Sequence, residues 1–74
     1  MDKKPTLHDY ETAEVIREAT HAELKASKEA AFRDGGAGVI EIELSARALR
    51  KTNNERFRRG LPAATNPVSC YAME

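Results

Sequence analysis

The chain has 74 residues, 12 of them basic and 12 acidic, so its formal net charge is zero and favours neither nucleic acid nor a membrane surface. Its length allows one domain, residues 1–74, with a small core that self-association would supplement. A single cysteine excludes an internal disulfide and fits a reducing compartment. No run approaches the roughly 20 apolar residues of a bilayer span, and the charged N-terminus disfavours a secretory signal. We expect a soluble cytoplasmic protein without a membrane partner.

The first predicted element is a long helix from Leu7 to about Arg33, after a flexible N-terminus of residues 1–5. Thr6 is placed to cap this helix, and Asp9 three residues later completes a capping-box pattern. No Gly or Pro interrupts the segment, and Ala, the best helix former, is abundant in it. Asp34-Gly35-Gly36 then supplies a helix stop.

Small apolar residues recur on one face of this expected helix, at spacings of three and four residues. Small side chains let two helix axes approach closely, so the stripe predicts a seam between two copies of the chain. The helix would be about 40 Å long, whereas a compact chain of this length is about 30 Å across, which also favours a homodimer. The alternative is a bent helix that folds back on its own chain. The seam residues are Val15, Ala19, Ala22, Ala26 and Ala30.

A short strand is predicted at residues 39–44, where apolar and acidic residues alternate. One face carries Ile40, Ile42 and Leu44, and the other carries Glu41 and Glu43. The partner of this strand is either a C-terminal strand at residues 68–73 or the same strand of a second copy. The glycines before it, Gly35 to Gly38, follow a helix instead of preceding one, so they indicate a joint and not a phosphate-binding loop.

A second helix is predicted from Ser45 to Arg59, and Gly60-Leu61-Pro62 ends it. Its inward residues are expected to be Ala46, Leu49 and Phe57. Thr52-Asn53-Asn54 favours non-helical conformations and weakens the middle of the helix, with a break in two as one outcome. The tail, residues 62–74, is expected to be partly extended.

Basic residues are concentrated on this second helix, whereas the chain before it is mildly acidic. A basic helix favours binding to phosphates or to an acidic protein surface. The alternative is a solvated face that pairs with the acidic first half. Glu55 is the only acidic residue between Arg47 and Arg59. The expected partner- or phosphate-binding residues are Arg47, Arg50, Lys51, Arg56, Arg58 and Arg59.

Candidates for catalysis and metal binding are weak. Glu18 and His21 have the spacing of carboxylate-bridged metal sites in helix bundles, with Glu14 on the same face. Such a site needs further ligands that point into a bundle core. This face instead carries Arg17, Lys25 and Lys28 and is expected to be solvated, so no metal site is expected. Cys70 has no neighbour that would lower its pKa, which favours a small hydrophobe in a strand over a nucleophile. We expect no enzyme activity and no cofactor.

Together these features predict a helix-dominated α+β domain with the order helix, strand, helix, strand. The predicted function is that of a small non-enzymatic adaptor or regulator. It would act by protein–protein binding as a homodimer, with the basic helix presented to an acidic protein surface. The alternative is a nucleic-acid-binding regulator that uses the same basic helix, residues 45–60, on phosphates.

Overall fold

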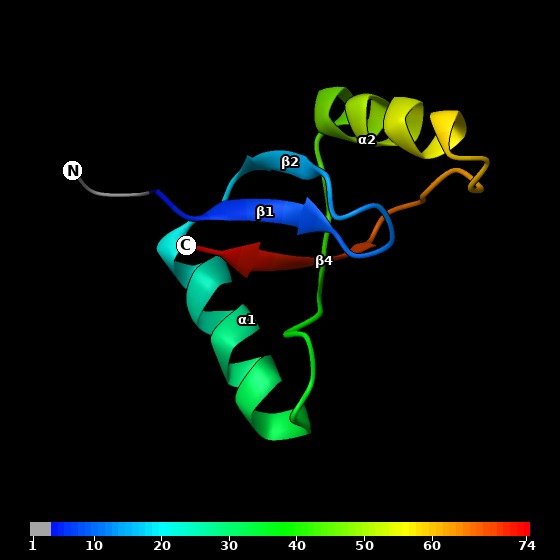
Figure 1. Ribbon diagram of the computed structural model, residues 1–74. Helices are drawn as coiled ribbons and strands as arrows, with labels where there is room; N and C mark the ends of the chain where they lie inside the picture. Colours follow the sequence, from blue (N-terminus) through cyan, green and yellow to red (C-terminus); the bar gives the residue numbers. More distant parts are fainter. Residues whose placement is uncertain (1–3) are drawn as a thin grey trace.

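The computed structural model describes residues 4–74 as a four-stranded antiparallel sheet with two helices (Figure 1). The strand order is β2-β1-β4-β3. The elements in chain order are β1 (Thr6–Asp9), β2 (Val15–Glu18), α1 (His21–Asp34), β3 (Ile40–Ile42), α2 (Ala46–Arg58) and β4 (Val68–Met73). The α+β class is confirmed. The description "helix-dominated" is not quite right, because a four-stranded sheet stands beside the two helices.

The predicted long helix from Leu7 to about Arg33 is wrong. Its first part forms the antiparallel hairpin of β1 and β2, and only the 14 residues of α1 are helical. The hairpin brings Leu7 into the core at 0% exposure and pairs β1 with β4 along four residues. Backbone pairing on both sides of β1 therefore outweighs the helical preference of the sequence.

The turn between β1 and β2 is built without glycine. The backbone N–H of Ala13 donates to the carbonyl of Asp9 (2.8 Å), and the N–H of Asp9 donates to the carbonyl of Glu14 (3.0 Å). Ala13 adopts the left-handed conformation with φ 63°, which costs a residue with a β-carbon more than it costs glycine. The side chains of Asp9 and Thr12 accept backbone N–H groups two residues further on, as in Asx and ST turns.

Helix α1 begins at a capping box that lies inside the predicted helix. The hydroxyl of Thr20 accepts the N–H of Glu23 (3.1 Å), and the Glu23 carboxylate accepts the N–H of Thr20 (2.9 Å). The helix ends as predicted at Gly35, which takes the left-handed conformation with φ 60°. One buried side chain, Ser27, ties α1 to the sheet: it donates to the carbonyl of Gly38 (2.7 Å) and accepts the N–H of Ala72 (3.1 Å).

The strands of the second half are confirmed. β3 carries half-buried Ile40 and Ile42 with exposed Glu41 between them, and Leu44 beyond the strand is buried. Of the two possible partners of β3, the structure shows the C-terminal strand: β4 pairs with β3 on one side and with β1 on the other.

The second helix is also confirmed, with corrections to its detail. Ser45 caps it by accepting the N–H of Ala48 (3.2 Å), and the helix continues through Thr52-Asn53-Asn54 without a break. The side chain of Asn53 exchanges two hydrogen bonds with the backbone of Ala64 (2.7 and 3.2 Å), so it fixes the segment that follows α2 to the helix. Of the expected inward residues, Leu49 is half-buried, whereas Ala46 and Phe57 are exposed.

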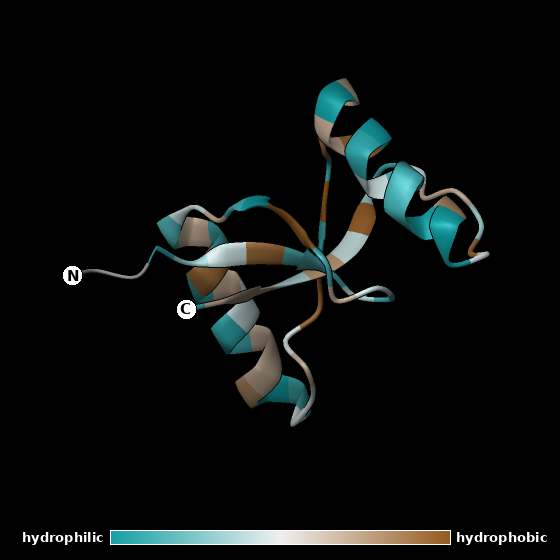
Figure 2. Cartoon of the chain, turned by 45° about the horizontal axis from the view of Figure 1, so that its top comes forward, coloured by the Kyte–Doolittle hydropathy of each residue, from teal (hydrophilic) through white to brown (hydrophobic). Residues whose placement is uncertain are grey.

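The core lies on one face of the sheet, and hydrophobic colour gathers where the strands cross in Figure 2. The opposite face carries an aromatic stack of His8 in β1 on Tyr71 in β4, with ring centroids 5.3 Å apart. Half of the Met73 side chain is exposed beside them. The buried hydrophobic residues are Leu7, Ile16, Leu44, Val68 and Cys70.

The sequence predicts irregular structure at both ends of the chain, in residues 1–5 and 62–74. Residues 1–3 of the predicted flexible N-terminus lie outside the described residues, and Lys4 and Pro5 lead into β1. The predicted extended tail is extended and paired from Val68 onward as β4. Before it, the side chain of Asn66 bonds both backbone groups of Leu44. Among residues 4–74, neither helix has the length and apolar character needed to cross a bilayer.

Candidate binding face on α2

The basic residues predicted as a binding site divide between two sides of α2. Arg47, Arg50 and Lys51 are exposed, as are Arg58 and Arg59 at the C-terminal end. The helix repeat places most of these side chains on the side opposite Thr52, which is buried against the sheet. Figure 2 shows hydrophilic colour over much of this helix.

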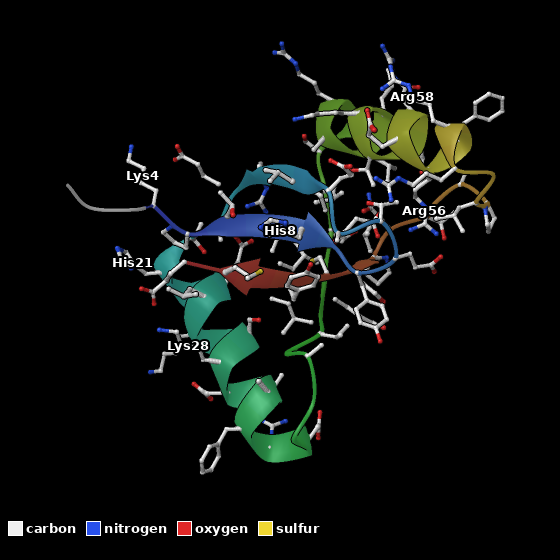
Figure 3. The ribbon with its side chains drawn as sticks, in the orientation of Figure 1. Lys4, His8, His21, Lys28, Arg56 and Arg58 are labelled. Carbon is white, nitrogen blue, oxygen red and sulfur yellow. The ribbon has the colours of Figure 1, made fainter. Side chains whose placement is uncertain are left out.

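Arg56 is the exception, and its assignment as a partner-binding residue is wrong. Its Nη1 lies 3.1 Å from both carboxylate oxygens of Asp9, and its Nε donates to the carbonyl of Pro62 (2.9 Å). Glu11 adds a longer ion pair at 3.4 Å. Figure 3 shows Arg56 directed from α2 toward the β1–β2 turn, whereas Arg58 points away from the sheet. The guanidinium, 8% exposed, therefore anchors α2 internally.

The two basic residues at the C-terminal end are partly neutralised. Arg58 pairs with Glu55 one turn earlier on the same helix (2.7 Å), and Arg59 pairs with Glu14 next to β2 (2.6 Å). These pairs are exposed and contribute little to stability. The Arg59–Glu14 pair matches the solvated alternative, in which basic residues of the helix pair with the acidic first half, whereas the Arg58–Glu55 pair lies within α2.

Arg47, Arg50 and Lys51 form the remaining set, which we call the cationic face. Within residues 4–74, no carboxylate forms an ion pair with any of the three. Three like charges on neighbouring turns repel one another. An incoming anionic group relieves that repulsion.

Phe57 lies on the same side of α2 and is 82% exposed. Sequence reasoning placed it in the core and so missed it as a functional candidate. The signal was present in the spacing, since Arg50, Asn54 and Phe57 stand four and three residues apart and share one helical face. An exposed aromatic ring next to cations is a typical anchor for a partner protein.

A hollow of about 310 Å³ opens beside the cationic face, between the first turns of α2 and strand β2. Its lining is mostly apolar, and Arg47 and Lys51 are among the residues that line it. The third cation of the lining, Arg17, is already paired within the chain, because it donates to both carboxylate oxygens of Glu23 at 2.8 Å. This pairing lowers the pKa of Glu23 to about 2 and raises the pKa of Arg17. The lining residues are Ile16, Arg17, Ser45, Arg47, Ala48 and Lys51.

The predicted dimer seam does not exist as one helical stripe. Val15 lies in β2 and is 46% exposed, and Ala19 lies in the link to α1. Only Ala22, Ala26 and Ala30 share a helix, and the first two are exposed. Helix α1 has 14 residues, about half of the predicted length, so it no longer exceeds the expected diameter of the domain. The seam prediction failed because its stripe was drawn across a hairpin and a helix.

The weak chemical candidates occupy separate places. Cys70 is 0% exposed in β4, and burial raises the pKa of its thiol to about 11, the direction opposite to that of a nucleophile. Glu14 pairs with Arg59, and Glu18 lies 4.0 Å from Lys4. No group of three His, Cys, Asp or Glu side chains within residues 4–74 is arranged to hold a metal ion.

Another hollow, of about 820 Å³, runs along α1 beside Phe32. All of its lining side chains come from this one helix, so no second element closes it. The face on α2 instead combines unpaired cations, an exposed ring and a hollow shared with β2. No protein-family model matches the chain, and no curated protein or solved structure matches it significantly.

Proposed function

We propose that this chain is a small non-enzymatic binding protein that docks an acidic protein surface on the outer side of α2. The observation that supports this proposal is the cationic face: Arg47, Arg50 and Lys51 are exposed and have no acidic partner among the described residues. Exposed cations steer an acidic partner toward the face and fix its orientation. They contribute more to association rate and specificity than to affinity.

The affinity comes from the apolar parts of the same surface. Phe57, at 82% exposure, loses most of its contact with water when a partner covers it. The hollow next to Ala48 has room for an apolar side chain, and Arg47 and Lys51 are among the residues that line it. A partner with carboxylates around a leucine or aromatic residue would therefore fill the hollow with its apolar side chain and pair its carboxylates with Arg47 and Lys51.

Nucleic acid is the other possible occupant of these cations. Its phosphates would engage Arg47, Arg50 and Lys51 without using the apolar hollow. The chain carries as many acidic as basic residues, so it lacks the broad positive field that supports nucleic-acid binding at physiological salt. We therefore infer a protein partner and treat nucleic acid as an outcome of the test.

The test uses a fluorescent acidic peptide that contains leucine, with short duplex DNA and single-stranded RNA as competing probes. Arg47→Ala/Arg50→Ala/Lys51→Ala should weaken peptide binding about tenfold or more. Lys25→Ala/Lys28→Ala/Arg33→Ala removes three exposed positive charges from α1 and serves as the matched control, which should bind like the wild type. Phe57→Ala should weaken peptide binding without changing the salt dependence.

Two outcomes would contradict the proposal. Equal binding of the acidic peptide by the triple variant and by the α1 control would remove α2 from the site. Tight, salt-sensitive binding of DNA or RNA, with none of the peptide, would assign the face to phosphates. Homodimer formation remains a prediction from the small core, and sedimentation of the free protein measures it directly.

A further inference from the structure

Strand β3 lies at one edge of the sheet. It pairs with β4 through Ile40↔Cys70, Glu41↔Ser69 and Ile42↔Val68. The strand order leaves its other side without a strand partner within residues 4–74. In Figure 1, where β3 is not drawn as an arrow, residues 40–42 lie in the long green connection between α1 and α2.

Hydrogen bonds around β3 establish which of its backbone groups face outward. The Asn66 side chain bonds both the N–H (2.8 Å) and the carbonyl (3.0 Å) of Leu44, so Leu44 directs its backbone toward the β4 side. Alternation in an antiparallel ladder gives Ile42 and Ile40 the same direction. Glu41 and Glu43 must then direct their N–H and carbonyl groups away from the sheet.

An independent contact agrees with this assignment. Ser69, the ladder partner of Glu41, uses its carbonyl to accept the N–H of Tyr10 (3.1 Å) on the β1 side. A residue of β4 that directs its backbone N–H and carbonyl toward β1 cannot also bond the backbone of β3 on the other side. The ladder position Glu41↔Ser69 is therefore one at which neither residue bonds the other, and the backbone of Glu41 is available to a further strand.

The side chains at this edge carry negative charge. Glu41 and Glu43 are exposed and stand on the same side of β3, because they are two positions apart. Neither forms an ion pair within residues 4–74. Ile40 and Ile42 point to the opposite, half-buried side. The edge thus offers unpaired backbone groups next to two unpaired carboxylates.

We propose that the free edge of β3 binds an extended basic segment of a partner protein by strand addition. The partner's backbone would bond the N–H and carbonyl of Glu41, and Lys or Arg side chains at alternate positions would lie beside Glu41 and Glu43. Main-chain bonds supply affinity in this mode, and the side chains supply specificity. This surface is separate from α2 and selects the opposite charge.

A second copy of this chain is a poor occupant of the edge. A two-fold antiparallel pairing centred on β3 would set Glu41 against its own counterpart, and like charges directly opposite destabilise a strand pair. Charges at a sheet edge commonly prevent pairing between copies. The same two carboxylates that act against self-pairing favour a basic strand.

The experiment titrates the protein with a peptide of alternating Lys and Val, and with its Glu-Val counterpart as a charge control. Binding of the Lys-Val peptide should shift the amide NMR signals of Glu41 and Glu43 and leave those of α2 unchanged. Glu41→Pro removes the outward N–H and is compatible with an edge strand. Glu41→Thr removes the same charge but keeps that N–H. The proline variant should bind at least fivefold more weakly than the threonine variant.

A second pair of variants keeps the test independent of how well proline is tolerated. Glu41→Lys/Glu43→Lys should reverse the preference at the β3 edge, so that the amide NMR signals of residues 41 and 43 shift more with the Glu-Val peptide than with the Lys-Val peptide, whereas binding of the Glu-Val peptide to α2 is followed separately through the signals of that helix. Glu29, an exposed carboxylate on α1, provides the control: Glu29→Lys should leave both affinities unchanged. Equal binding by all variants, amide shifts confined to α2, or a dimer abolished by Glu41→Pro would each overturn the proposal.

Discussion

Arg56 Nη1 lies 3.1 Å from each carboxylate oxygen of Asp9, although 47 residues separate the two along the chain. The Asp9 side chain is 1% exposed and that of Arg56 is 8% exposed. This pair joins the last turns of α2 to the β1–β2 hairpin. It explains why an acidic residue is buried at the end of β1.

Arg56→Ala should destabilise the protein by about 3–5 kcal/mol, because it leaves the carboxylate of Asp9 buried without a neutralising charge. That loss is a large part of the roughly 5–15 kcal/mol that stabilises a typical domain. Urea unfolding measures it. Arg50→Ala, on the exposed side of the same helix, should change the free energy of unfolding by less than about 0.5 kcal/mol. Similar effects of the two substitutions would show that the buried pair does not stabilise the fold.

Gly38→Ala should also be strongly destabilising, by about 2 kcal/mol or more. A β-carbon at Gly38 would lie 2.7 Å from the carbonyl oxygen of Ser27 and 2.9 Å from its hydroxyl, and the residue has φ 77°. Gly36→Ala is the control, since a β-carbon there meets nothing within 4 Å. Thermal unfolding of the two variants compares them, and a Gly38→Ala melting temperature equal to that of Gly36→Ala would rule out the close approach of α1 to this loop.

The Arg17–Glu23 pair should stabilise the protein in a pH-dependent way. Its hydrogen bonds lower the pKa of Glu23 from the ordinary value of 4.5 to about 2. An unfolded chain therefore binds more protons than the folded one between these values, so the stabilisation is complete above about pH 4.5 and disappears as the pH falls toward 2. Arg17→Met should cost about 1 kcal/mol at neutral pH, given the partial exposure of the pair.

Urea unfolding of wild type and Arg17→Met at several pH values gives the difference in their free energies of unfolding. That difference should narrow as the pH falls below about 4.5. Lys25→Met, on the exposed side of α1, should show no such narrowing. A difference that stays constant down to about pH 2 would mean that Glu23 titrates normally in the folded protein.

Cys70 should resist alkylation while the protein is folded. Burial raises the pKa of its thiol to about 11, so at about pH 8 the thiolate fraction is roughly a hundredfold below that of an exposed cysteine. Mass spectrometry after treatment with iodoacetamide should show an unmodified folded protein and rapid modification in urea. Rapid modification without urea would indicate that β4 opens frequently.

The sequence was sufficient to predict the second half of the fold. Ile40, Ile42 and Leu44 alternate with glutamates, Ser45 is a strong N-cap, and Val68 begins a run suited to a strand. These signals are local, since each depends on residues a few positions apart. The structure agrees with each of them, and β4 takes one of the two pairings left open for β3.

The first half could not be predicted in the same way. Its hairpin turns at Ala13, whose left-handed φ of 63° replaces the glycine or asparagine that would have marked a turn. The inward Asp9 disguises the alternation of β1, and the charge that neutralises it comes from Arg56, which is 47 residues away along the chain. One local signal was available and was overlooked: Thr20 and Glu23 form the capping box of α1 within the segment read as a single helix.

The binding face on α2 was only partly predictable for the same reason. Local sequence identifies a basic helix, but it does not show which of its cations turns inward. Arg56 turns inward because of a residue in β1, and Phe57 turns outward because the inner positions of the helix are filled by Leu49, Thr52 and Arg56.

The position of β4 between β1 and β3 constrains how the protein can fold as it is synthesised. Until Val68–Met73 leave the ribosome, the amino-terminal hairpin and β3 have no shared ladder, and the inner edges of both are open. Completion of the sheet therefore waits for the last strand to be made. Nascent chains would gain protease resistance abruptly when that segment emerges.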